Sequence, residues 1–126
     1  MAFNLSPIIQ PQYVAEAAAA ALTLTVTVAG ATAAAVPALT RLSLWTARFT
    51  NVTASPVTLI VYRVPSGGAA GAATTVVAVI TIPVATAANP YFDWSPGYVL
   101  APGDAIWALA GTVSALVVTG DGGITA

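Results

Sequence analysis

Short apolar runs, bounded by proline, glycine, asparagine or serine, divide this chain from about residue 20 to its end. The first run, Leu22 to Val28, alternates aliphatic residues with threonine, which is the period-two pattern of a strand with one buried face. Seven or eight such runs follow one another, and none shows the spacing of an amphipathic helix. The pattern predicts an all-β chain that folds as an antiparallel β-sandwich, and among sandwiches it favours a jelly roll.

The runs are expected to form one domain over residues 14–126, with no internal repeat. Val57 to Val64 is apolar at both odd and even positions, which favours a central strand covered on both faces. In the first strand, the residues expected to face the core are Leu22, Leu24, Val26 and Val28. The expected strands cover about 20–28, 39–51, 57–64, 74–82, 91–94, 98–100, 105–110 and 115–119, and Asp121–Gly123 closes the chain.

The strand over 39–51 changes phase in its middle. Its apolar residues take even positions before Trp45–Thr46 and odd positions after it. A strand with one buried face keeps its parity unless a bulge or bend intervenes. We therefore predict a bulge or bend near Trp45–Thr46. The arginines of opposite parity, Arg41 and Arg48, are expected to point outward.

Residues 1–13 are expected to form an extended N-terminal arm outside the sandwich. Pro7 and Pro11 disfavour both helix and strand in this segment. Such an arm can lie on a neighbouring subunit; the alternative is a frayed terminus. The apolar side chains available to anchor it are Ile8, Ile9 and Tyr13.

Charged residues make up 6% of the chain, against about 25% in an ordinary soluble domain. Three arginines cannot supply the electrostatic grip that nucleic acid or an anionic membrane requires. The lack of cysteine, histidine and lysine excludes disulfide frameworks, zinc sites and histidine-based catalysis. So uncharged a surface suits a protein covered by copies of itself or by a larger assembly. The alternative is an ordinary soluble domain from a host biased toward alanine.

The stretch from Ala17 to Thr40 holds 24 residues without a charge, which is long enough for a membrane-spanning helix. Five threonines, Gly30 and Pro37 interrupt it, and its alternation is that of a strand. The start of the chain lacks the basic residues of a signal peptide. We therefore expect no membrane partner and synthesis in the cytoplasm.

The acidic residues fit no catalytic template. Asp104 follows Pro102 and Gly103, where a type II turn lets its carboxylate bond local backbone amides. Asp93 can instead pair with an arginine. Together with Asp121 these residues do not form a recognisable calcium loop. The sequence therefore predicts no enzyme activity, no cofactor and no metal site.

Aromatic residues gather between positions 91 and 98. Flat rings can stack on sugars, so a carbohydrate-binding platform of Tyr91, Trp94 and Tyr98 is one interpretation. Packing in the core or at a subunit interface is the other, and we favour it. The full set of candidate interface residues is Ile8, Ile9, Tyr13, Tyr91, Phe92, Trp94 and Tyr98.

Residues 48–68 read F-T-N-x-T-A-S-x-V-T-x-x-V-Y-x-V-P-S-G-G from Phe49 onward. This segment resembles a recurring segment of small structural proteins of tailed bacteriophages. The end of the chain is similar as well, with Val99–Ile106 followed by a valine-rich strand and a glycine-rich end. The resemblance extends over about residues 40–123.

The resemblance implies a virion component with no enzymatic role. Small jelly rolls of such virions serve as cement or decoration proteins on the capsid, and others belong to the tail or the base of head fibres. A cement protein of this kind has the major capsid protein and copies of itself, as a dimer or trimer, as partners. Its expected location is the capsid surface of the virion, after synthesis in the host cytoplasm.

Overall fold

The computed structural model describes residues 6–16, 19–25, 32–36, 41–68 and 75–125, which form strands joined by turns. The predicted strands over 57–64, 91–94, 98–100 and 105–110 are confirmed with those bounds. The strands are β1 (Ser6–Tyr13), β2 (Ala20–Ala21), β3 (Leu24–Thr25), β4 (Thr32–Ala33), β5 (Arg41–Asn51), β6 (Val57–Val64), β7 (Val76–Ile82), β8 (Tyr91–Trp94), β9 (Tyr98–Leu100), β10 (Ala105–Ala110) and β11 (Leu116–Thr125).

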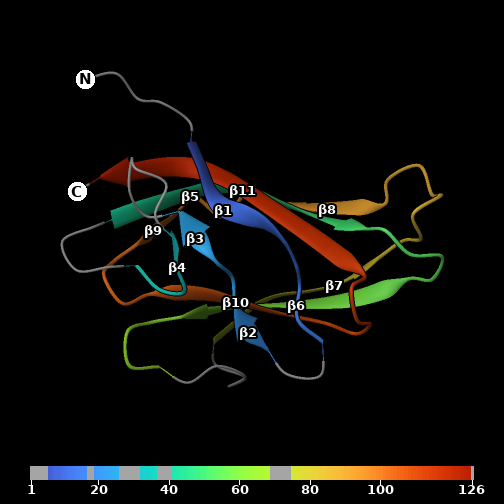
Figure 1. Ribbon diagram of the computed structural model, residues 1–126, viewed down its shortest axis with the longest axis horizontal. Coiled ribbons are helices and arrows are strands. Elements are labelled where there is room, and N and C mark those ends of the chain that lie inside the picture. The colour runs from blue at the N-terminus through green and yellow to red at the C-terminus, as the bar shows by residue number, and fades with distance from the viewer. Residues whose placement is uncertain (1–5, 17–18, 26–31, 37–40, 69–74, 126) are drawn as a thin grey trace.

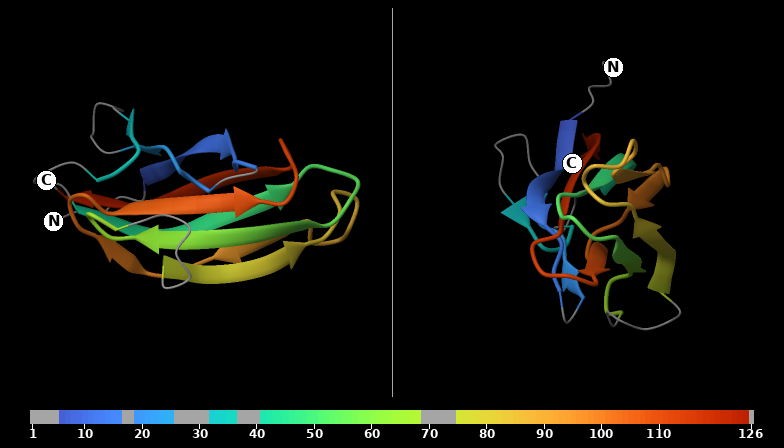
Figure 2. Two further views of the ribbon diagram at one scale, coloured as in Figure 1. Left: turned by 90° about the horizontal axis from the view of Figure 1, so that it is seen from below. Right: turned by 90° about the vertical axis from the view of Figure 1, so that its right-hand side faces the viewer.

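Two antiparallel sheets stack face to face, so the predicted all-β sandwich is confirmed (Figure 1, Figure 2). The larger sheet has the order β4-β3-β1-β11-β5-β8, and β9 also pairs with β5. The smaller sheet has the order β2-β10-β6-β7. In Figure 1 the larger sheet lies across the top of the view and the smaller sheet lies below it.

Four sets of strand pairings are nested along the chain. β1 pairs with β11 and β2 pairs with β10. Further inward along the chain, β5 pairs with β8 and β9, and β6 pairs with β7. The chain therefore follows the path of one long hairpin that is folded over on itself, and each sheet joins strands that are far apart in sequence.

Aliphatic side chains from the facing sides of both sheets fill the space between the layers. Each fully buried side chain of this size stabilises the fold by about 1.5–3 kcal/mol relative to its exposure in water. The largest of these side chains are Phe49, Ile8, Ile9, Leu24, Leu42, Leu44, Leu59, Ile82, Leu100, Ile106, Leu116 and Val14.

The predicted bulge in the strand over 39–51 is confirmed. Thr46 pairs with Asp121 and Leu44 pairs with Gly122, so Trp45 has no opposite residue on β11. Burial falls on even positions before Trp45 and on odd positions after it. Trp45 itself is 40% exposed. Arg41 and Arg48 are exposed, as expected.

Residues 6–13 are not an arm. They form β1, which lies between β11 and β3 in the larger sheet, and Ile8 and Ile9 are 0% exposed. The strand accommodates its prolines because its register with β11 shifts between Pro7 and Ile9 and again before Gln12. The division of the chain at residue 13 is therefore wrong for residues 6–13. Residues 1–5 lie outside the described residues.

The single strand expected over about 20–28 is instead two short strands in different sheets. β2 pairs with β10 in the smaller sheet, and β3 pairs with β1 in the larger one. Leu22 lies at the crossing, where its N–H donates to the Ile106 carbonyl at 2.8 Å. Leu22 and Leu24 are buried, as predicted, because the alternation indicates burial but not which sheet a residue joins. Val26 and Val28 lie outside the described residues.

β11 continues well beyond its predicted end, through the glycine-rich segment. A Cβ at Gly120 would come within 2.8 Å of Ile9 Cδ1, and a Cβ at Gly122 would collide with the Ser43 carbonyl oxygen. Glycine usually weakens a strand, which is why the sequence indicated an end here. In the fold these glycines let β1 and β5 approach β11 closely.

Polar side chains also join the two sheets near opposite ends of the sandwich. Asn51, at the end of β5, is buried, and its Nδ2 donates to the carbonyls of Ile82 at 3.2 Å and Pro83 at 3.0 Å. Arg63, on β6, donates from Nη2 to the Val99 carbonyl of β9 at 3.1 Å. These contacts fix the alignment of the layers in addition to the apolar core.

Candidate interaction surfaces

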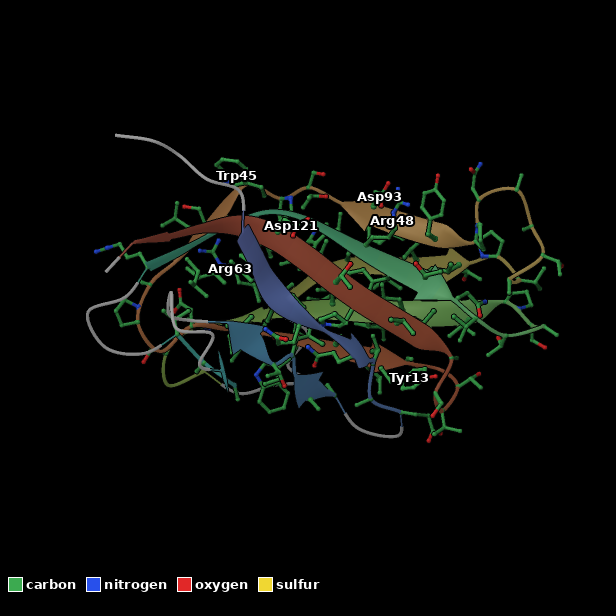
Figure 3. The ribbon with its side chains drawn as sticks, turned by 45° about the horizontal axis from the view of Figure 1, so that its top comes forward. Tyr13, Trp45, Arg48, Arg63, Asp93 and Asp121 are labelled. Atoms are coloured by element: carbon green, nitrogen blue, oxygen red, sulfur yellow. The ribbon has the colours of Figure 1, made fainter. Side chains whose placement is uncertain are left out.

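Asp93 forms an ion pair with Arg48 on the outer face of the larger sheet (Figure 3). Arg48 Nε donates to Asp93 Oδ1 at 2.6 Å, and Nη2 donates to Oδ2 at 2.8 Å, so the pair is bidentate. The guanidinium also lies over the Tyr91 ring, 4.0 Å from its centroid. The expectation that Asp93 pairs with an arginine is confirmed.

Hydrogen bonding from Arg48 lowers the pKa of the Asp93 carboxyl; desolvation partly opposes this effect, and the positive charge of Arg48 adds a smaller lowering. The hydrogen bonds to Asp93 raise the pKa of Arg48 in turn. Both side chains are open to solvent, so the pair contributes little to stability and is screened by salt. The arrangement holds two fixed charges and does not tune either group for proton transfer near neutral pH.

A polar hollow of about 270 Å³ lies beside this ion pair. Its threonine hydroxyls, guanidinium and carboxylates can form hydrogen bonds with a polar group of a partner. Within the described residues, no three acidic side chains gather as a metal site would require. The residues that line the hollow are Thr46, Arg48, Asp93, Thr119 and Asp121.

Asp104 belongs to a turn, as the sequence predicted. Its N–H donates to the Ala101 carbonyl at 3.0 Å, and Gly103 has a φ of 89°, which a type II turn requires at its third residue. Asp104 Oδ2 accepts from the Ala101 N–H at 3.0 Å, and Oδ1 accepts from the Ser66 N–H at 3.2 Å. The carboxylate therefore ties the loop after β9 to the loop after β6.

The larger sheet divides the aromatic residues of positions 91–98 between its two faces. Phe92 stacks on Phe49 with ring centroids 6.4 Å apart. Trp94 is 7% exposed and meets Tyr98 edge-on, at 5.7 Å between centroids. Tyr91 points the other way, because neighbouring residues of a strand face opposite sides. These rings therefore do not form one flat platform, and the favoured interpretation of core packing describes Phe92, Trp94 and Tyr98.

Burial separates the seven candidate interface residues into three groups. The residues that the fold covers are Ile8, Ile9 and Trp94. Those that pack partly against the core are Phe92 and Tyr98. Those on the outer face of the larger sheet are Tyr13, which is exposed, and Tyr91, which is half-buried. The interface prediction is wrong for Ile8 and Ile9, because both side chains pack in the core of their own chain.

The smaller sheet presents an outer surface that we call the apolar face. Of the described residues in β6, β7 and β10, only Arg63 is charged, and its guanidinium reaches across to β9. Val79 lies in the middle of β7 and is 64% exposed. By the register of the sheet, the residues of the apolar face are Thr58, Ile60, Tyr62, Val76, Val79, Thr81, Trp107 and Leu109.

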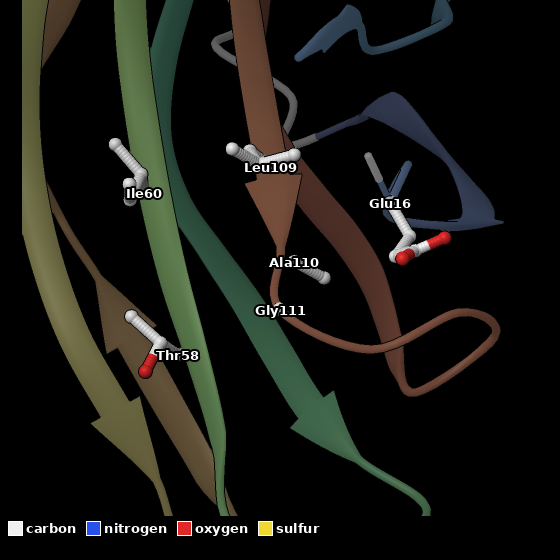
Figure 4. A pocket seen from close by; sticks show the side chains of 6 residues that line it. All are labelled: Glu16, Thr58, Ile60, Leu109, Ala110 and Gly111. Carbon is white, nitrogen blue, oxygen red and sulfur yellow. The ribbon is translucent and has the colours of Figure 1, made fainter. Parts of the chain in front are cut away.

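A hollow of about 270 Å³ opens at one end of the apolar face (Figure 4). Figure 4 shows Thr58, Ile60 and Leu109 on one side of it and Glu16 on the other. Its lining is aliphatic apart from the Thr58 hydroxyl and the Glu16 carboxylate, which suits an apolar group with one polar neighbour. Ala110 and Gly111 complete the lining.

Sequence reasoning did not single out the apolar face. Residues 57–64 are apolar at both odd and even positions, and this pattern predicts a strand that is covered on both faces. β6 is the central strand that this pattern predicts, with β10 and β7 as its neighbours. Cover on the outer face of β6 is partial within this chain, because Tyr62 is buried but Thr58 is exposed and Ile60 is only half-buried.

The part of the chain that the structure describes contains no helix with the length and hydrophobicity needed to cross a membrane. A scan against protein-family models found no match, and neither the curated proteins nor the solved structures gave one.

Proposed function

We propose that this chain is a non-enzymatic structural protein of a tailed-bacteriophage virion, acting as a capsid cement or decoration protein. It bridges and stabilises major capsid subunits at the capsid surface and associates with copies of itself, after synthesis in the host cytoplasm. The observation that carries the proposal is the apolar face, a sheet surface without charge in a chain with only seven charged residues.

Contiguous apolar surface on a soluble domain marks a place where a partner binds. Covering it stabilises a complex by roughly 25 cal/mol for each Å² of apolar area removed from water. On a capsid the same weak contact is repeated over a symmetric lattice, so avidity is high although no single contact is strong. Binding to the assembled shell alone then stabilises the shell by mass action.

We propose further that the sandwich is a jelly roll. The nested pairing supports this: β1 with β11, β2 with β10, β5 with β8 and β9, and β6 with β7. A hairpin of eight long strands rolled into two sheets has this order, and jelly rolls are frequent among viral capsid domains.

The segment that resembles phage structural proteins, residues 48–68, supplies part of the apolar face. It comprises the end of β5, the turn that begins at Asn51, and β6. β6 contributes Thr58 and Ile60 to the apolar face. The segment that carries the resemblance therefore also contributes to the apolar face.

Co-sedimentation with expanded phage shells that lack this protein tests the proposal. We expect saturation at a lattice multiple of copies per shell, and shells that resist heating better than untreated ones. Leu109→Lys places a charge on the apolar face and is expected to weaken binding at least tenfold. Val99→Lys places the same charge at an exposed aliphatic position of β9 in the larger sheet, and is the matched control with unchanged binding.

Failure of the wild-type protein to bind any shell overturns the cement assignment. A few to tens of copies in each virion, together with binding to isolated tails, indicates the alternative of a tail or head-fibre-base component. Equal loss of binding in Leu109→Lys and Val99→Lys would show that the apolar face does not bind the shell.

A further inference from the structure

β7 is the free edge of the smaller sheet. It pairs with β6 on one side, and no described residue pairs with its other side. Figure 2 (left) shows β7, in yellow, at the margin of the molecule. Val76–Ile82 contains no charged residue, proline or glycine. A bulge between Val76 and Ala78 and the proline at position 83 bound a regular edge of five residues, 78–82.

The other sheet edges are protected in ways that β7 is not. β2 and β4 have two residues each, and β8 and β9 have four and three. β8 also carries the Asp93 carboxylate. Short strands and charges are the devices by which proteins keep their edges from pairing with other chains. Among the described strands, β7 is the edge best able to accept another strand.

The hydrogen bonds inside the sheet show which groups β7 directs outward. The Gly111 N–H donates to the Thr58 carbonyl at 2.9 Å, so Thr58 directs its backbone groups toward β10. Neighbouring residues of a strand direct theirs to opposite sides, so Leu59 faces β7, where its partner is Ile80. Ile80 therefore directs its N–H and C=O back to β6. The residues whose N–H and C=O point to the open edge are Val79 and Thr81.

We propose that a second copy of this chain pairs with this edge, antiparallel, about a twofold axis at Ile80. Val79 then lies opposite Thr81 of the second copy, and each such pair exchanges two backbone hydrogen bonds. Ile80 lies opposite Ile80 of the second copy, and this pair exchanges no backbone hydrogen bonds. The inference rests on the proposed function, in which the chain associates with itself.

The edge favours a second copy because the residues that would oppose one another in an antiparallel pair of two β7 strands fit side by side. With the axis at Ile80, Ala78 meets Ile82 and Val79 meets Thr81, so aliphatic and β-branched side chains lie side by side. No charge opposes a like charge. An exposed row of N–H and C=O groups is satisfied by a strand and not by a flat apolar surface. The interface is isologous, as in most protein dimers, and it continues the apolar face from one copy to the other.

Proline at position 79 tests the pairing. Val79→Pro removes the outward N–H and leaves the bonds between β7 and β6, and proline is tolerated at an edge position of this kind. Val79→Thr keeps the N–H and the branched side chain, and is the matched control. By light scattering after gel filtration, we expect the wild type and Val79→Thr to be dimers. Val79→Pro is expected to lose the dimer and keep the far-UV circular dichroism of a folded sandwich.

A disulfide provides a second test, because the chain has no cysteine of its own. Opposed residues in a pair without hydrogen bonds have Cα atoms about 4.5 Å apart, within the range that a disulfide spans. Ile80→Cys is therefore expected to give a covalent dimer under mild oxidation. Val113→Cys, on an exposed loop, measures cross-linking by random collision and is expected to give no covalent dimer. Equal cross-linking of both variants, or none in Ile80→Cys, overturns the proposal.

These results separate the pairing from the proposed function. A wild-type protein that is monomeric at every concentration tested, and still saturates shells, overturns the pairing alone. A dimer that is lost in Val79→Pro, but never binds shells, supports the pairing and overturns the proposed function. If Val79→Pro does not fold, the comparison of Ile80→Cys with Val113→Cys decides the question.

Discussion

Gly122, on β11, lies against Ser43 of β5 and Ile8 of β1. An added Cβ there would collide with the Ser43 carbonyl oxygen and lie 2.8 Å from Ile8 Cδ1. The first of these contacts is with backbone, so rotation of a side chain cannot relieve it. The strand pairing of the larger sheet therefore requires glycine at this position.

We expect Gly122→Ala to lower the free energy of unfolding by at least about 3 kcal/mol, because β5 must move away from β11. Gly111→Ala is the matched control, since its Cβ would meet β6 atoms no closer than 3.8 Å. Its effect is expected within about 0.5 kcal/mol. Urea unfolding followed by tryptophan fluorescence measures both, and equal midpoints would show that the strands have room to adjust.

Asp93 makes part of the stability depend on pH. Its folded-state pKa is lowered, so its contribution is present above the unfolded pKa and is lost as the pH falls through the folded one. Asp93→Asn is expected to lower the melting temperature slightly at pH 7 and low salt. The difference from wild type should disappear as the pH falls well below about 4, and also at high salt. A difference that persists in acid would indicate packing, not charge, as the cause.

The bulge at Trp45 sets which side chains of β5 reach the core. Without the extra residue, Leu42 and Leu44 would move to the outer face, because a shift of one residue reverses every side chain. Deletion of Trp45 is therefore expected to abolish cooperative thermal unfolding. Trp45→Thr keeps the residue count and is expected to cost less than about 1 kcal/mol, because the side chain is partly exposed. A deletion variant that melts like Trp45→Thr would show that β5 can slip without loss.

Strand positions were largely predictable at this scale, because alternation and turn residues act locally. The phase change in β5 even located the bulge from four apolar residues. Local pattern could not show that residues 20–25 divide between two sheets, or that Gly120 and Gly122 continue β11. Both follow from contacts with strands distant in sequence, namely β10 and β1.

The candidate site was predicted in part for the same reason. The Asp104 turn involves neighbours in sequence and was foreseen. Asp93 was expected to pair with an arginine, but the choice of Arg48 requires the register of β5 with β8. The apolar face was missed because a strand apolar at both parities does not reveal which partner covers its second side.

The whole sandwich depends on β1, although proline at two positions had suggested a detachable arm. Ile8 and Ile9 fill the core, and β1 joins β11 to β3. Deletion of residues 1–13 is therefore expected to abolish the cooperative unfolding transition, by the loss of two large buried side chains and one strand of the larger sheet. Calorimetry measures this. A transition retained at the wild-type temperature would show that β1 is dispensable to the fold.

Nested pairing also determines what can form while the chain is being made. A ribosome completes β1 first among these strands and β11 last, and every strand from β2 to β10 emerges between them. The central pair of the larger sheet thus cannot close until the glycine-rich strand has left the exit tunnel. Until then β1 has only the two-residue strand β3 beside it in the larger sheet, and nascent chains on neighbouring ribosomes are exposed to one another. A β topology of this kind closes slowly, so β1 waits longest of all the strands for its main partner.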